Sequence, residues 1–193
     1  MNKRWMMVVL FTIHYSLFTS PIGAQTMRDV IKQMPDSLVP YLKQNARLDF
    51  IDFIDSGMKA EVSNELGGKS QLTELTDDFA SFTLNAVSQI QLRLLDVNEP
   101  IDDARQIVCM VRTFGGGMRE STIGFYSVKW QPLPEEERIS LPSYMHYITL
   151  SSEAPELTVY RETGLEVPAN EEQKEMDVTL ISFKWNGKEF KMY

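Results

Sequence analysis

The sequence predicts an α+β fold, in which N-terminal helices are followed by a mostly antiparallel sheet built from hairpins. Two observations predict this order. Apolar residues recur with helical spacing as far as about Gly57, and from about Phe79 they alternate with polar residues. Near the C-terminus, Asn186-Gly187 separates two alternating runs, and Asn-Gly is the strongest short signal for a hairpin.

Residues 1–24 have the pattern of a cleavable signal peptide. Lys3 and Arg4 form a positive start, a mostly apolar uncharged stretch over 5–18 follows, and Ala24 is a small residue at the expected cleavage point. A membrane anchor is less favoured, because a spanning helix needs about 20 apolar residues. No cysteine follows the apolar stretch, as a lipoprotein would require. We therefore expect residues 25–193 to form one exported domain, periplasmic or secreted and not a lipoprotein.

Two short helices are expected at the start of this domain. The first begins after Thr26, and the second covers 38–42 with Asp36 or Ser37 as its cap. Pro40 is tolerated because it falls in the first turn of the second helix.

A third helix is predicted over 47–56, and Gly57 is placed to end it. At about 100° per residue its apolar side chains fill one arc and its acids the opposite side. The apolar residues are Phe50, Ile51, Phe53 and Ile54, and the acids are Asp49, Asp52 and Asp55. The acids are explained as the solvated face of an amphipathic helix.

Strands are predicted where apolar and polar residues alternate or where a short apolar run occurs. They cover residues 79–86, 90–94, 106–113, 121–130, 145–150, 157–161, 178–185 and 188–193. The prolines and acids of 131–142 predict a loop, and 166–177 is charged and irregular.

The chain is acidic, with 27 Asp and Glu residues against 19 Lys and Arg and a net charge of −8. Loss of Lys3 and Arg4 with the signal peptide lowers this charge by two, to −10. Such a chain repels phosphate backbones, so we expect no nucleic-acid partner. After residue 24, no stretch is long and apolar enough to predict a transmembrane segment.

One cysteine and one histidine, Cys109 and His146, remain when His14 leaves with the signal peptide. Cys109 falls in an apolar strand, which predicts a small buried residue with a raised pKa rather than a nucleophile. One Cys and one His cannot build a typical zinc site without carboxylates. Gly67-Gly68-Lys69-Ser70 lacks the first glycine of a phosphate-binding loop. We expect no metal and no cofactor.

Aromatic residues gather in the predicted hairpins. Tyr126, Val128 and Trp130 share one strand face, and Ile181, Phe183 and Trp185 share another. Such stripes usually belong to a core. If one face is open to solvent, Tyr126, Trp130 and Trp185 are the best candidate binding residues.

Four stretches resemble those of a Bacteroidales family of small exported proteins of unknown function. They are MPDSL (34–38), LDFIDFIDSGM (48–58), LTELTDD (72–78) and FYSVKW (125–130). The resemblance covers most of residues 25–193 and implies a Gram-negative envelope or secreted location. That family has no assigned activity, so it implies no site residue.

Two main functional hypotheses remain. The first is an exported, non-catalytic domain that binds a protein or a cell-envelope component such as a glycan, with no catalytic residue assigned. The alternative is a hydrolase of glycans or peptidoglycan that uses two carboxylates and needs no histidine. A purely structural envelope subunit is a third possibility. A binding domain should show an open apolar or aromatic patch, and a hydrolase should show two carboxylates facing each other in a cleft, one with a raised pKa.

Overall fold

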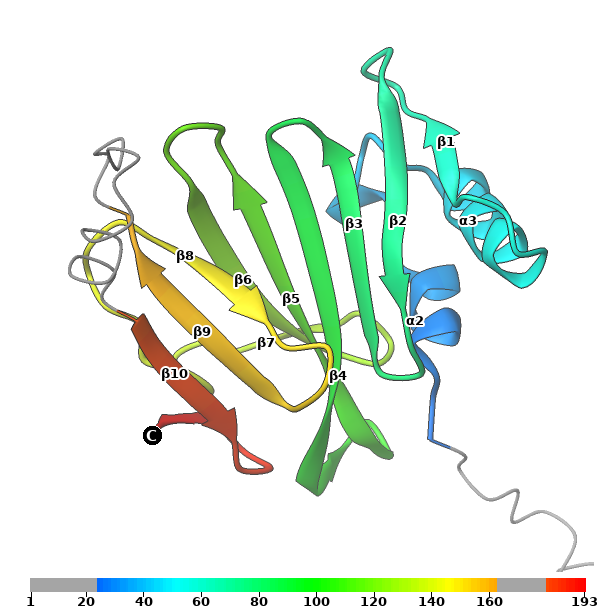
Figure 1. Cartoon of the computed structure of the whole chain (residues 1–193). Helices are drawn as coiled ribbons and strands as arrows, with labels where there is room; N and C mark the ends of the chain where they lie inside the picture. Colours follow the sequence, from blue (N-terminus) through cyan, green and yellow to red (C-terminus); the bar gives the residue numbers. More distant parts are fainter. Residues whose placement is uncertain (1–23, 163–179) are drawn as a thin grey trace, which may run out of the picture.

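Antiparallel strands make up most of the structure. The computed structural model describes residues 24–162 and 180–193, and strands account for 47% and helices for 14% (Figure 1). The α+β prediction with an N-terminal helical part is therefore wrong, because the helices are short and contribute far less of the structure than the strands do. Residues 1–23 of the predicted signal peptide and the irregular stretch 166–177 lie outside the described residues.

The first and third predicted helices are confirmed. Helix α2 (Met27–Gln33) begins at Thr26, whose side chain accepts a hydrogen bond from the Asp29 N–H in a capping box. Helix α3 (Gln44–Asp55) buries Phe50 and Ile51, and Gly57 follows it with a φ of 67°.

The second predicted helix does not form. Only a single 3-10 turn, η1 (Asp36–Leu38), occurs there, and the chain leaves helical geometry at Val39, whose φ is −139°. The physical reason is Pro40, which disfavours helical geometry in the residue before it. Too few residues precede it to complete an α-helical turn.

The strands form two antiparallel sheets. The large sheet contains seven strands in sequence order: β1 (Glu61–Ser63), β2 (Lys69–Leu75), β3 (Phe79–Asn85), β4 (Ser88–Ile101), β5 (Ala104–Phe114), β6 (Glu120–Ser127) and β7 (Pro132–Leu133). The small sheet contains β8 (His146–Leu150), β9 (Glu156–Arg161), β10 (Leu180–Trp185) and β11 (Phe190–Met192), in the order β11-β10-β9-β8. Strands β1, β2 and β7 are additional to those the sequence predicted.

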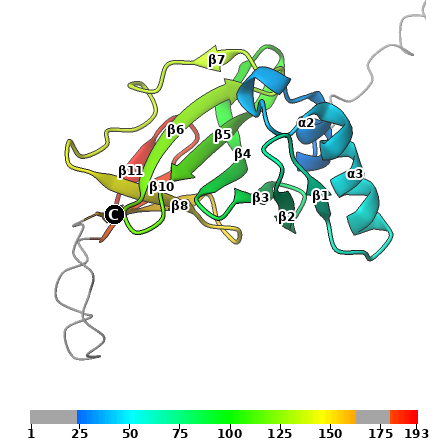
Figure 2. The same cartoon turned by 90° about the horizontal axis from the view of Figure 1, so that it is seen from above.

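The large sheet is covered on both faces, and strand β5 shows this directly. Its Val108 and Met110 join the core cluster that includes the helices, whereas Ile107, Cys109 and Val111 join the cluster that includes the small sheet. The molecule therefore has three layers, and in Figure 2 the helices lie to the right of the large sheet, away from β8 and β10. Burial on both faces explains why β5 is a continuous apolar run.

Polar side chains of the large sheet bind the backbone of β8 and of the loop that follows it. The backbone N–H of Ile148 donates to Ser121 Oγ at 2.9 Å, and that of Leu150 donates to Gln91 Oε1 at 2.9 Å. Arg93 donates to the Ser151 carbonyl at 2.8 Å and to Asp78 at 2.7 Å, with only 4% of its side chain exposed. These bonds satisfy backbone groups on the free edge of the small sheet.

Arg47 organises the irregular segment between the helices. Its side chain is completely buried and donates to the carbonyl oxygens of Met34 and Leu42. It also lies 2.9 Å from the carboxylate of Asp36, which is half exposed. One guanidinium therefore binds both ends of the segment that fails to form a helix.

We predict that Arg47→Met destabilises the protein by about 3 kcal/mol, because two buried carbonyl groups lose their donor. Asp36→Asn is the matched control and should cost less than about 1 kcal/mol, because its carboxylate is well exposed. Urea unfolding followed by circular dichroism measures both values. A loss below about 1 kcal/mol for Arg47→Met would show that Arg47 is not needed to hold this segment.

A second prediction concerns acid stability. Hydrogen bonds from Lys59 and Lys69 lower the pKa of Glu61 from 4.5 to about 2. Because the folded-state pKa is lower than the unfolded one, this contribution is complete above pH 4.5 and disappears as the pH falls toward 2. Glu61→Gln should therefore reduce stability at pH 6 and make little difference at pH 2, and salt should weaken the effect. Equal losses at both pH values would contradict this assignment.

Candidate functional site

The two tryptophans predicted as binding residues are core residues. Trp130 is 5% exposed and Trp185 is 8% exposed. They belong to different core clusters, on opposite faces of the large sheet. The structure therefore favours the core alternative for these stripes, and the two side chains do not share a surface.

Tyr126 is partly buried beside Trp130, with ring centroids 5.4 Å apart. Its ring also covers Gly124, where an added Cβ would lie 3.2 Å from the tyrosine ring. Trp130 does not continue the strand as predicted. It occupies a turn with a φ of 63°, a conformation that costs energy for a bulky residue.

Both indole N–H groups bind backbone carbonyls. Trp130 Nε1 donates to the Val30 carbonyl of α2 at 3.0 Å, and Trp185 Nε1 donates to the Asp96 carbonyl of β4 at 2.6 Å. Each tryptophan therefore connects segments distant in sequence. The Trp130 bond joins the turn after β6 to α2, and the Trp185 bond holds the β4 segment at the free end of the β4–β5 hairpin.

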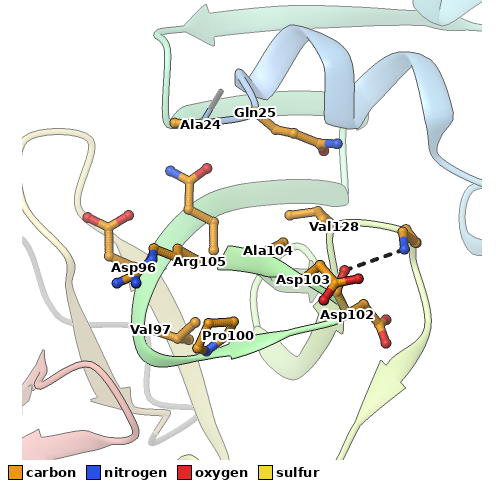
Figure 3. Close-up of a pocket in the computed structure, with 12 residues that line it drawn as sticks. Ala24, Gln25, Asp96, Val97, Pro100, Asp102, Asp103, Ala104, Arg105 and Val128 are labelled. Atoms are coloured by element: carbon orange, nitrogen blue, oxygen red, sulfur yellow. Dashed lines mark hydrogen bonds between the residues drawn. The ribbon is translucent and has the colours of Figure 1, made fainter. Parts of the chain in front are cut away.

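A cleft of about 880 Å³ lies at that end of the hairpin (Figure 3). Its walls come from the start of the described chain, from the hairpin and from the turn after β6. The lining residues are Ala24, Gln25, Asp96, Val97, Pro100, Asp102, Asp103, Ala104, Arg105, Gln106, Val128 and Lys129.

The hairpin end has a tight turn that orients its carboxylates. Ile101 pairs with Ala104, so Asp102 and Asp103 form a two-residue connection, with φ values of 52° and 67°. Two positive φ values are typical of the turn that matches strand twist. Lys129 Nζ lies 3.4 Å from the Asp102 carbonyl, which brings the turn after β6 to the hairpin.

The cleft presents groups of both charges. Three carboxylates (Asp96, Asp102, Asp103), two cations (Arg105, Lys129) and two amides (Gln25, Gln106) line it. The Oε1 of Gln25 is buried without a hydrogen-bond partner within the described residues. This mixture suits a ligand that has both donors and acceptors, such as a peptide backbone or a sugar.

Among the other chemical groups, Cys109 is completely buried, and burial together with the charge of Glu135 raises the pKa of its thiol. This confirms the prediction for Cys109. His146 Nδ1 lies 2.7 Å from the Tyr144 carbonyl. Within residues 24–162 and 180–193, no three His, Cys, Asp or Glu residues are grouped as a metal site would require. No helix in these ranges is long and apolar enough to cross a membrane.

Partial burial and the charge of Glu136 raise the pKa of Glu135, as a catalytic acid would need. Glu135 does not line the cleft. The raised pKa and the cleft carboxylates are therefore in different places.

Sequence reasoning missed the cleft because its residues come from three separate segments. One part of the cleft could have been found from residues 100–103, where a proline and two acids follow an alternating run and so indicate the end of a hairpin. These residues marked a hairpin end, but its position next to Gln25 and Lys129 depends on tertiary packing.

Fold and cleft together define a three-layer β protein with a ligand-sized cleft at the end of its longest hairpin. The chain belongs to a family described as "Protein of unknown function (DUF3256)", which matches residues 19–188.

The fold is similar to that of a solved structure, a domain of an uncharacterized protein from Porphyromonas gingivalis W83. The TM-score is 0.70 at 19% sequence identity, over 88% of this chain and 98% of that chain. At this identity the similarity concerns the fold alone. That organism belongs to the Bacteroidales, the group named by the sequence resemblance. None of the curated proteins matches the chain.

We predict that Trp130→Phe lowers the free energy of unfolding by about 1–2 kcal/mol, because the Val30 carbonyl loses its buried donor. Chemical denaturation measures this loss. In the expected mature chain, residues 25–193, this variant leaves Trp185 as the single tryptophan, and its emission should be resistant to acrylamide quenching, as expected for a buried indole. Ready quenching would contradict its placement in the core.

Proposed function

We propose that this protein is an exported, non-catalytic domain that binds a protein or a cell-envelope component in the cleft at the end of the β4–β5 hairpin. The observation that carries the proposal is the cleft itself. Its volume of about 880 Å³ is within the range of ligand sites, roughly 300–1,000 Å³. Its lining offers both charges and amide groups at one place.

Fixed walls support a binding role, because a preformed site loses less entropy when it binds. Trp185 holds the backbone of Asp96, and Asn98 N–H donates to the Gly187 carbonyl at 2.9 Å. Trp130 lies in the turn that carries Val128 and Lys129 and binds α2. In this proposal Tyr126, Trp130 and Trp185 position the walls and do not contact the ligand.

Export is supported by the charge and apolar pattern of residues 1–24. The expected mature chain, residues 25–193, would act as one domain in the periplasm or outside the cell, and it keeps every cleft-lining residue except Ala24. Its acidic charge favours a protein or glycan partner over a nucleic acid.

The proposal can be tested by capturing envelope components with the purified protein. Ala104→Trp should fill the cleft and abolish capture, and Lys129→Glu should weaken it through charge reversal. Lys191→Glu is the matched control, because Lys191 is exposed on β11 outside the cleft-lining residues. Retention of the wild-type partner by both cleft variants would overturn the proposal.

Incubation with purified peptidoglycan distinguishes the hydrolase alternative. We expect no release of soluble fragments. Release that disappears in Asp96→Asn or Asp103→Asn, with the fold intact, would favour hydrolysis over binding alone.

A further inference from the structure

We propose that a second cavity, between the β4–β5 hairpin and the β10–β11 turn, binds a carboxylate through the side chain of Arg138. This site is separate from the cleft described above, although Val97 and Pro100 line both. Its volume is about 300 Å³, enough for a small acidic group. The lining residues are Val97, Asn98, Glu99, Pro100, Ile101, Glu137, Arg138, Gly187 and Lys188.

The three walls of the cavity are held together by backbone hydrogen bonds. Asn98 N–H donates to the Gly187 carbonyl at 2.9 Å, and Phe190 N–H donates to the Arg138 carbonyl at 2.7 Å. Gly187 has a φ of 93°, and an added Cβ there would lie 2.4 Å from the Asn98 side chain. The cavity is therefore a fixed feature where three segments distant in sequence meet.

Arg138 is a buried cation with three of its five N–H donors uncommitted. The residue is 9% exposed. Its Nη1 donates to the Pro134 carbonyl at 2.8 Å and lies 3.6 Å from the Glu137 carboxylate. Within the described part of the chain, Nε is buried without a partner and Nη2 has no hydrogen bond to protein.

The guanidinium atoms of Arg138 that lack a hydrogen-bond partner indicate what kind of ligand would bind. Nε and Nη2 form one edge of the guanidinium, and two parallel N–H groups on such an edge match the two oxygens of a carboxylate. An unsatisfied buried donor costs free energy that a bound acceptor would recover. Lys188 adds a second positive charge at the wall.

The two acidic side chains that line the cavity favour a ligand with a single negative charge. Glu99 and Glu137 also line the cavity, so its charged side chains sum to zero. A phosphate dianion would meet stronger repulsion from these two carboxylates than a carboxylate would. The chemistry therefore points to a carboxylate, from a small acid or from an acidic residue or C-terminus of a peptide.

The test is an NMR titration of the purified protein with sodium acetate at constant ionic strength, with inorganic phosphate and chloride as comparison anions. Acetate should give saturable shifts at the Asn98 and Gly187 amides, and phosphate and chloride should not. Arg138→Lys keeps the charge but loses the two-donor edge, so the acetate affinity should fall by about tenfold. An acidic peptide with a free C-terminus, compared with its C-terminal amide, identifies which carboxylate binds better.

Two further variants test the site without replacing the buried side chain of Arg138. Lys188→Gln should weaken acetate binding, and Glu137→Gln should strengthen it by removing a competing carboxylate. Lys191→Gln is exposed outside the cavity-lining residues and should leave the affinity unchanged. The proposal is overturned by an absence of saturable acetate shifts, by equal binding of phosphate, or by weaker acetate binding in Glu137→Gln.

Discussion

Both proposed sites depend on how the free end of the β4–β5 hairpin is held. Strand β4 has 14 residues, whereas its neighbour β3 has seven, so the end of β4 lacks the support of β3. Backbone groups at this end need other partners, because buried N–H and C=O groups are nearly always paired. Trp185 binds the Asp96 carbonyl and Gly187 binds the Asn98 N–H. These two bonds fix one hairpin segment that forms a wall of the cleft on one side and of the Arg138 cavity on the other.

Elsewhere in the fold, buried arginines provide hydrogen-bond partners for backbone groups. Arg47, Arg93 and Arg138 each donate to at least one backbone carbonyl in a segment without regular structure, and each lies near a carboxylate. In this way loops pack against the sheets with their carbonyl groups satisfied. Arg138 differs because it lines a cavity.

The sequence predicted the central strands of the large sheet well and the strands near its edges poorly. Strand β5 is buried on both faces and β3 carries a clear alternation, so their apolar patterns are strong. Strand β2 has only Ser70 and Leu72 buried, and its formation depends on pairing with β3. Tyr126 and Trp185 lie in strands as predicted, whereas Trp130 lies in the turn after β6. The two tryptophans are not binding residues as predicted, because both indole rings face a core layer and only their N–H groups reach the hairpin and helix backbones.

The sequence by itself determined the acidic character, the single Cys109 and His146 after residue 24, the antiparallel hairpins and two of the three predicted helices. These properties follow from composition and from local periodicity, which act over a few residues. Only the tertiary structure decided that both faces of the large sheet are covered, that the tryptophans are buried, and that two cavities flank one hairpin. The physical reason is that each of these features is made by segments far apart in the chain, and packing and hydrogen bonding between such segments leave no local pattern.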